Sequence, residues 1–109
     1  MVEIKSIVIN GENCFKLTEN GHNVCACFYN PVNSEIIDLE EYDLHDVFFN
    51  KAVVKAVLNN LDLNGVETVF CKKKELGSLL TELGFIYNEA EEVYILNLKG
   101  YFETGCCKG

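Results

Sequence analysis

The chain has 109 residues, the length of one domain, and 49% of them are hydrophobic. Seventeen Asp and Glu stand against nine Lys and no Arg, which gives a net charge of −8. So acidic a chain lacks the basic footprint of a nucleic-acid-binding protein and the positive charge that an anionic membrane surface attracts. The composition therefore predicts an acidic globular domain that binds neither nucleic acid nor membranes.

The first residues do not show a basic segment followed by an apolar run, so we expect no signal peptide and a cytoplasmic protein. No apolar stretch approaches the ~18 residues of a membrane span. The six cysteines show no C-x-x-C spacing, so we expect no metal site and treat most of them as small buried residues of a reducing compartment. They are Cys14, Cys25, Cys27, Cys71, Cys106 and Cys107.

Alternating and β-branched segments predict four strands in the first half of the chain, separated by turn signals such as Asn20-Gly21. They cover residues 2–9, 14–18, 22–29 and 35–44. In the fourth strand, strict alternation puts Ile37, Leu39 and Glu41 on one face, opposite Ile36, Asp38 and Glu40.

The period then changes to that of a helix over residues 46–62, with apolar residues from Phe49 to Leu61 on one face. Asp43 or Asp46 can cap its start, and Asn64-Gly65 ends it. A strand over 66–71, a second helix marked by Leu76, Leu79, Leu80 and Leu83, and two strands over 85–87 and 93–98 follow.

This order predicts an α+β fold, in which two main helices pack on a mixed, mostly antiparallel sheet. A meander comes first, then helix, strand, helix, strand and strand. The crossover from residue 44 to residue 66 should join parallel neighbours. We expect one domain over residues 1–100 and a mobile tail over 101–109.

The segments 51–58, Gly65-Val66-Glu67-Thr68-Val69-Phe70 and Leu83-Gly84-Phe85 resemble, in order and spacing, the second half of a GNAT-family acyltransferase domain. The resemblance covers about residues 22–98 and implies the minimal type of that fold, because no helices fit between the first two strands. It implies acetyl-CoA or another acyl-CoA as cofactor, an amine as acceptor, and a sheet that splays between strands four and five.

The family's cofactor signature, Arg/Gln-x-x-Gly-x-Gly/Ala, aligns with His45 to Asn50 at the start of the long helix. The resemblance therefore implies a cofactor-binding group, which consists of His45, Val47, Phe48, Asn50 and Lys51. Backbone N–H groups at a helix start hold phosphates, and glycines allow close approach. Phe48 and Asn50 stand in the glycine places, so we expect Phe48 to crowd that approach. Asp46 adds a negative charge that costs on the order of 1–3 kcal/mol near a dianion.

The family often uses a Glu on strand four as base and a Tyr on the last helix as acid. Glu40 and Glu41 lie at the base position, whereas Leu80 stands in the Tyr place. Cys71 lies where some minimal members carry a Cys, and the Lys72–Lys74 run could lower its pKa and make it a nucleophile.

Seven carboxylates fall between Lys16 and Lys51 with no Lys among them, a patch suited to a cationic small-molecule or peptide amine. Two functions stay open: acyl transfer from an acyl-CoA to an amine, or a non-catalytic relative that binds a partner or forms a homodimer. A third alternative is an unrelated meander-plus-helix fold of the cystatin type, whose sheet would not splay.

Overall fold

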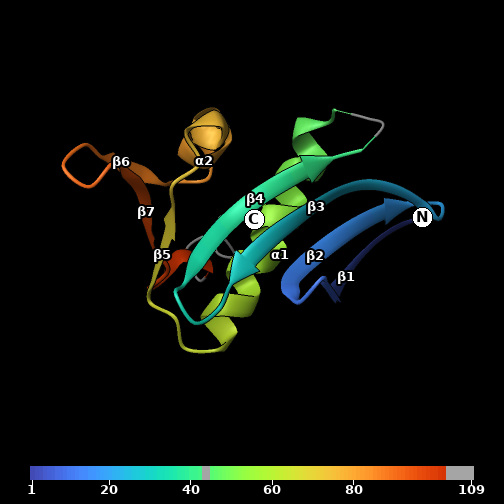
Figure 1. Ribbon diagram of the computed structural model, residues 1–109, viewed down its shortest axis with the longest axis horizontal. Coiled ribbons are helices and arrows are strands. Elements are labelled where there is room, and N and C mark those ends of the chain that lie inside the picture. Colours follow the sequence, from blue (N-terminus) through green and yellow to red (C-terminus); the bar gives the residue numbers. More distant parts are fainter. Residues whose placement is uncertain (43–44, 103–109) are drawn as a thin grey trace.

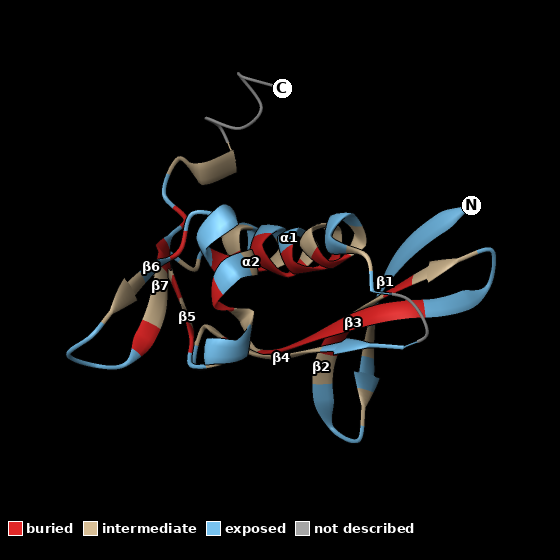
Figure 2. Cartoon of the chain, turned by 90° about the horizontal axis from the view of Figure 1, so that it is seen from above, coloured by how far each residue is buried: buried red, intermediate tan, exposed pale blue. Residues whose placement is uncertain are grey.

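The computed structural model describes residues 1–42 and 45–102. Seven strands form one sheet in the order β1-β2-β3-β4-β5-β7-β6, and both helices lie on one face of it (Figures 1 and 2). Every neighbouring pair is antiparallel except β4 and β5. The elements are β1 (Val2–Ile9), β2 (Glu12–Glu19), β3 (His22–Asn30), β4 (Glu35–Glu41), α1 (Val47–Leu63), β5 (Thr68–Cys71), the 3-10 turn η1 (Lys74–Leu76), α2 (Gly77–Glu82), β6 (Ile86–Asn88) and β7 (Val93–Asn97).

The predicted α+β class, the element order and the parallel neighbours at the crossover are confirmed. In the described part of the chain, no helix is both long and apolar enough to cross a membrane. Asn10-Gly11 and Asn20-Gly21 both have positive φ, the geometry of two-residue hairpin turns. Because each turn uses only two residues, β2 is longer than the predicted 14–18.

The main core lies between the sheet and the inner face of α1 (Figure 2). Val53, Val57 and Leu61 of α1 are fully buried there, at the spacing that the sequence predicts. The four described cysteines are buried and free, as expected; they are Cys14, Cys25, Cys27 and Cys71. Cys106 and Cys107 lie outside the described residues.

Two further strands, β5 and β6, begin two residues and one residue later than predicted, because hydrogen bonds at the preceding helix ends use the residues concerned. The Val66 N–H donates to the Leu61 carbonyl at 3.0 Å, so β5 begins at Thr68. The Phe85 N–H likewise donates to the Leu80 carbonyl at 2.9 Å, so β6 begins at Ile86.

The expected tail begins with two residues that pack against the core. The Tyr101 hydroxyl donates to the Leu83 carbonyl at 2.7 Å, and Phe102 lies beside it. Residues 103–109 lie outside the described part. The fourth strand, expected to reach residue 44, ends at Glu41; residues 43 and 44, with the alternative cap Asp43, are not described.

Candidate functional site

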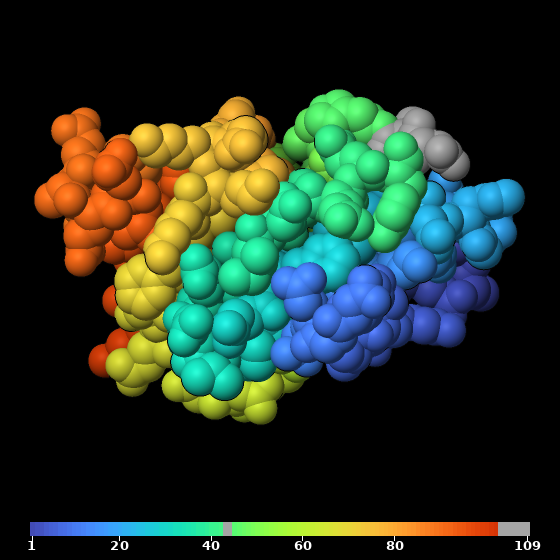
Figure 3. All heavy atoms as spheres, viewed as in Figure 1, coloured from blue at the N-terminus to red at the C-terminus, as the bar shows by residue number. Residues whose placement is uncertain are grey.

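Strands β4 and β5 pair over only two residue positions and then separate. Glu35 faces Phe70 and Ile36 faces Cys71; beyond them, β4 continues to Glu41 while the chain after β5 turns into η1 (Figure 1). A cavity of about 240 Å³, here called the slot, opens where the two strands diverge. Its lining residues are Leu39 and Glu41 of β4, His45, Val47 and Asn50 at the start of α1, and Glu75, Leu76, Ser78, Leu79 and Glu82 of η1 and α2. Figure 3 shows the two walls, β4 with the α1 start in green and α2 in yellow.

A register shift in β4 decides which strand carboxylate enters the slot. Opposite β3, Tyr29 faces Ile36 but Phe28 faces Asp38, so the strand has a bulge at Ile37. The alternation predicted for this strand is therefore wrong at its first half: Ile36 packs in the main core, while Ile37 joins the cluster on the opposite face. Beyond the bulge, Leu39 and Glu41 face the helices.

The structure thereby separates the two candidate bases. Glu41 lines the slot, whereas Glu40 faces Ala26, which belongs to the cluster on the far face of the sheet. Of the two candidates, Glu41 is the one that lines the slot.

Glu41 is held by two residues from the region of the α1 start. The Asn50 Nδ2 donates to its Oε2 at 2.8 Å, and the same oxygen pairs with His45 Nδ1. The Asn50 hydrogen bond is the largest cause that holds the pKa of Glu41 below its usual value. Burial, the next largest, opposes it, and His45 acts in the same direction as Asn50. Glu41 is therefore a fixed negative charge at neutral pH, better suited to hold a cation than to take a proton.

Asn50 brings a second polar atom to this place. The residue is only 4% exposed, and no donor among the described residues reaches its buried Oδ1. A buried acceptor without a partner costs about 1–3 kcal/mol, so a ligand N–H that reached it would be favoured.

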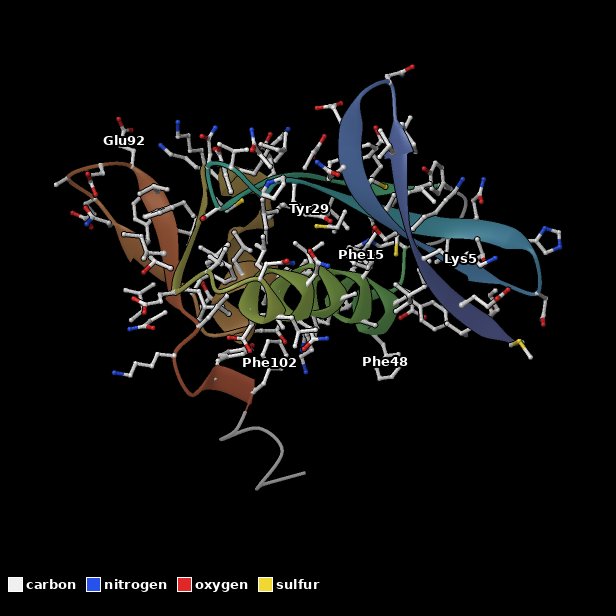
Figure 4. All side chains as sticks on the ribbon, turned by 90° about the horizontal axis from the view of Figure 1, so that it is seen from below. Lys5, Phe15, Tyr29, Phe48, Glu92 and Phe102 are labelled. Carbon is white, nitrogen blue, oxygen red and sulfur yellow. The ribbon has the colours of Figure 1, made fainter. Side chains whose placement is uncertain are left out.

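The start of α1 is closed by its own cap. Asp46 is the N-cap, and its Oδ1 accepts the Phe49 N–H at 3.2 Å, one of the groups that a phosphate would need. Phe48 is 75% exposed and points away from the sheet (Figure 4). The crowding of a phosphate by this side chain stays a prediction, and the Asp46 carboxylate, which accepts the Phe49 N–H, is a second obstacle at the same place.

Lys51 forms an ion pair within the protein. Its Nζ lies 2.6 Å from Glu82 Oε1, so it joins α1 to α2 across the slot. Three carboxylates (Glu41, Glu75 and Glu82) line the slot, and Lys51 neutralises one of them. The slot is therefore negatively charged.

Cys71 lies apart from the residues that line the slot. Its side chain is fully buried, and desolvation raises the pKa of the thiol, against a smaller lowering by the Lys73 backbone. The expected lowering of this pKa by the lysine run is wrong, because burial outweighs the nearby charge. The Lys73 Nζ lies 3.5 Å from Asp38, and Lys74 pairs with Glu92 at 3.3 Å.

The η1–α2 wall was not predicted as part of a site. Glu75, Ser78 and Glu82 repeat at helical spacing between the apolar Leu76, Leu79 and Leu80. That polar stripe is the signal in the sequence, but the same pattern is typical of an ordinary solvent-facing helix.

No protein-family model matches the chain, and no curated protein sequence does. Among solved structures, the ribosomal-protein-S18-alanine N-acetyltransferase from Escherichia coli superimposes with a TM-score of 0.69 at 15% identity, over 90% of this chain and 94% of that one. The chain has a GNAT-like fold. The cystatin-like alternative is thus wrong, and the predicted splay of the GNAT-like sheet is confirmed. At this identity the likeness concerns the fold, and the activity named is that of the E. coli enzyme.

Proposed function

We propose that this protein is N-acyltransferase-like and binds its acceptor amine in the slot. The observation that carries the proposal is the negative slot at the divergence of β4 and β5, with Glu41 fixed at its wall. A protonated amine gains from the carboxylates that line the slot. The reaction class proposed is transfer of an acyl group from an acyl-CoA thioester to that amine after it has lost a proton. The new C–N bond replaces the thioester C–S bond, coenzyme A leaves as the thiol with one proton of the amine, and the other proton goes to solvent.

The residues at the helix start do not fit the diphosphate of an acyl-CoA as they stand. The Asp46 carboxylate accepts the Phe49 N–H, and Lys51, the cation at this place, pairs with Glu82. A diphosphate would have to displace the cap and would meet its charge. The side chains thus support the amine half of the reaction and not the thioester half.

The cap favours a second function, that of an amine-binding module without catalysis. The Asp46 side chain already accepts the Phe49 N–H at the helix start, so this donor has a partner without a phosphate ligand. In this function Glu41 holds the amine, and no group needs to act as a base.

An acyl-transfer assay with acetyl-CoA separates the two functions. The acceptors are a diamine and a peptide with an N-terminal alanine, the second chosen because the E. coli enzyme is named for an alanine substrate. Turnover that falls at least about tenfold in Glu41→Gln and stays unchanged in Glu40→Gln supports acyl transfer in the slot. Glu40 is the matched control, since it is the next residue of β4 and faces the other side of the sheet.

Amine binding without turnover supports the module. Absence of both amine binding and turnover contradicts both functions.

A further inference from the structure

The outer edge of β1 is a long strand edge without a partner among the described residues. β1 is the end strand of the sheet and pairs with β2 in an unbroken register over all its residues, with no bulge and no proline. Val2, Ile4 and Val8 are 45%, 37% and 66% exposed. Such an edge is a template for another strand unless charges, bulges or a covering segment protect it.

The pairing with β2 shows which backbone groups face outward. The two-residue turn after Ile9 makes Ile9 and Glu12 a hydrogen-bonded pair, and at the other end Asn20 N–H donates to the Met1 carbonyl at 2.8 Å. Hydrogen-bonded pairs alternate along an antiparallel ladder. The odd-numbered residues of β1 therefore bond to β2, and Val2, Ile4, Ser6 and Val8 present N–H and C=O groups to the outside.

The charges on β1 select a partner. Glu3 and Lys5 lie two residues apart on either side of Ile4, on the same face of the strand, with Lys5 Nζ 3.9 Å from Glu3 Oε2. Turned by a two-fold axis through Ile4, this segment is complementary to itself: Glu3 comes opposite Lys5 of the second copy, and Lys5 opposite its Glu3. Opposite charges in directly facing positions stabilise a strand pair.

We propose that β1 pairs antiparallel with β1 of a second copy, about a two-fold axis between the two Ile4 residues. Ile4 then faces Ile4 of the second copy, and Val2 of each copy faces Ser6 of the other. All three residues present their backbone N–H and C=O groups outward, as the new ladder requires. The interface is isologous, so it closes at the dimer. It does not involve the slot and stands independently of the proposed function.

Other registers fit less well. Shifting one strand by two residues keeps outward-facing residues opposite each other. It sets Lys5 against Lys5 of the second copy in one direction and Glu3 against Glu3 in the other, and like charges in facing positions are unfavourable. The net charge of −8 on each chain also opposes association. At physiological salt that long-range repulsion is screened within about 8 Å, whereas directly facing pairs are closer than this.

Sedimentation velocity on the full chain at physiological salt, from about 1 µM to about 1 mM, tests the dimer. We expect a concentration-dependent dimer that Lys5→Glu or Glu3→Lys alone weakens roughly ten- to thirty-fold, because each change makes both facing pairs like-charged. The double change Glu3→Lys with Lys5→Glu exchanges the charges and should restore dimerisation. Lys55→Glu, the same charge change on the exposed side of α1, should leave it unaltered.

A monomer over the whole range overturns the proposal. So does a dimer that is indifferent to the single charge changes or is not restored by the exchange.

Amide hydrogen exchange reports the same interface without a mutation. The amides of Ile4 and Ser6 should become protected only as the concentration rises, while those of Lys5 and Ile7, which donate to β2, should be protected at every concentration. Ile4 and Ser6 amides that exchange equally fast in monomer and dimer place the interface elsewhere and overturn the proposal.

Discussion

The two ends of β4 both pair with β3 but differ on the side that faces β5. At its first end, Glu35 and Ile36 pair with β5, and Ile36 is 1% exposed in the main core. At its last end, no strand among the described residues pairs with Leu39 or Glu41 on the β5 side, and both residues line the slot. Packing fixes the closed end, whereas the open end is fixed by polar contacts to Asn50 and His45. The candidate site thus lies where β4 and β5 stop pairing.

The largest expected effect contrasts the two ends by removing one apolar side chain from each. Ile36→Ala should lower the free energy of unfolding by about 2–5 kcal/mol, since it leaves a cavity in a closed core. Leu39→Ala should cost less than about 1.5 kcal/mol, because that side chain is only half-buried and borders the slot. Urea unfolding measures both, and equal losses would mean that the open end is packed like the closed one.

The far wall of the slot depends on a close approach at Gly77. A Cβ built there collides with the Tyr94 hydroxyl oxygen and lies 3.1 Å from its Cζ. We expect Gly77→Ala to destabilise the protein by about 1–3 kcal/mol despite the higher helix propensity of Ala.

Adding Tyr94→Phe removes the colliding oxygen and should recover part of that loss in the same unfolding experiment. A Gly77→Ala protein as stable as the unaltered protein would show that the Tyr94 side chain moves aside at little cost.

The cap of α1 is the next smaller effect. Asp46→Ala should cost about 1 kcal/mol by leaving the Phe49 N–H unsatisfied, while Asp46→Asn keeps a capping oxygen and should cost only a few tenths. Because Asp46→Asn also removes the charge, it should bind coenzyme A more tightly than the unaltered protein does in calorimetry. No gain in affinity would show that this carboxylate is not an obstacle.

The smallest effect is a pH dependence at the open end. The pKa of Glu41 is lower in the folded protein than in the unfolded chain, so its contribution to stability is present above the unfolded value and disappears as pH falls through the folded one. The difference in free energy of unfolding between the unaltered protein and Glu41→Gln should therefore shrink as pH drops below the usual value of 4.5. A difference that stays constant from neutral pH to acid would contradict the contact with Asn50.

Local pattern predicts most of the fold but only part of the site. The α1 face from Phe49 to Leu61, both Asn-Gly turns and the Asp46 cap follow from spacing and capping chemistry, which act over a few residues. The bulge at Ile37 arises from the pairing of β4 with β3, which the sequence of β4 alone does not reveal. A strict alternation therefore assigns Ile36 to the wrong face of the sheet. The burial that raises the pKa of Cys71 likewise depends on packing between distant segments, which local spacing does not reveal.

Of the residues expected at the cofactor loop, some line the slot and others lie away from it. His45, Val47 and Asn50 do meet Glu41 at the slot, because the helix start and the end of β4 are close in sequence and in space. Phe48 and Lys51 turn elsewhere, one to solvent and one to Glu82. The direction of each depends on the turn of the helix and on α2, which a motif alignment does not include.

Calorimetric titration of a simple diamine into the unaltered protein, Glu41→Gln and Glu40→Gln tests most directly whether the open end of β4 is an amine site. We predict binding that weakens at least about tenfold in Glu41→Gln and is unchanged in Glu40→Gln, since one carboxylate faces the slot and its neighbour does not. Equal affinities in the two variants, or no binding to the unaltered protein, would contradict the account.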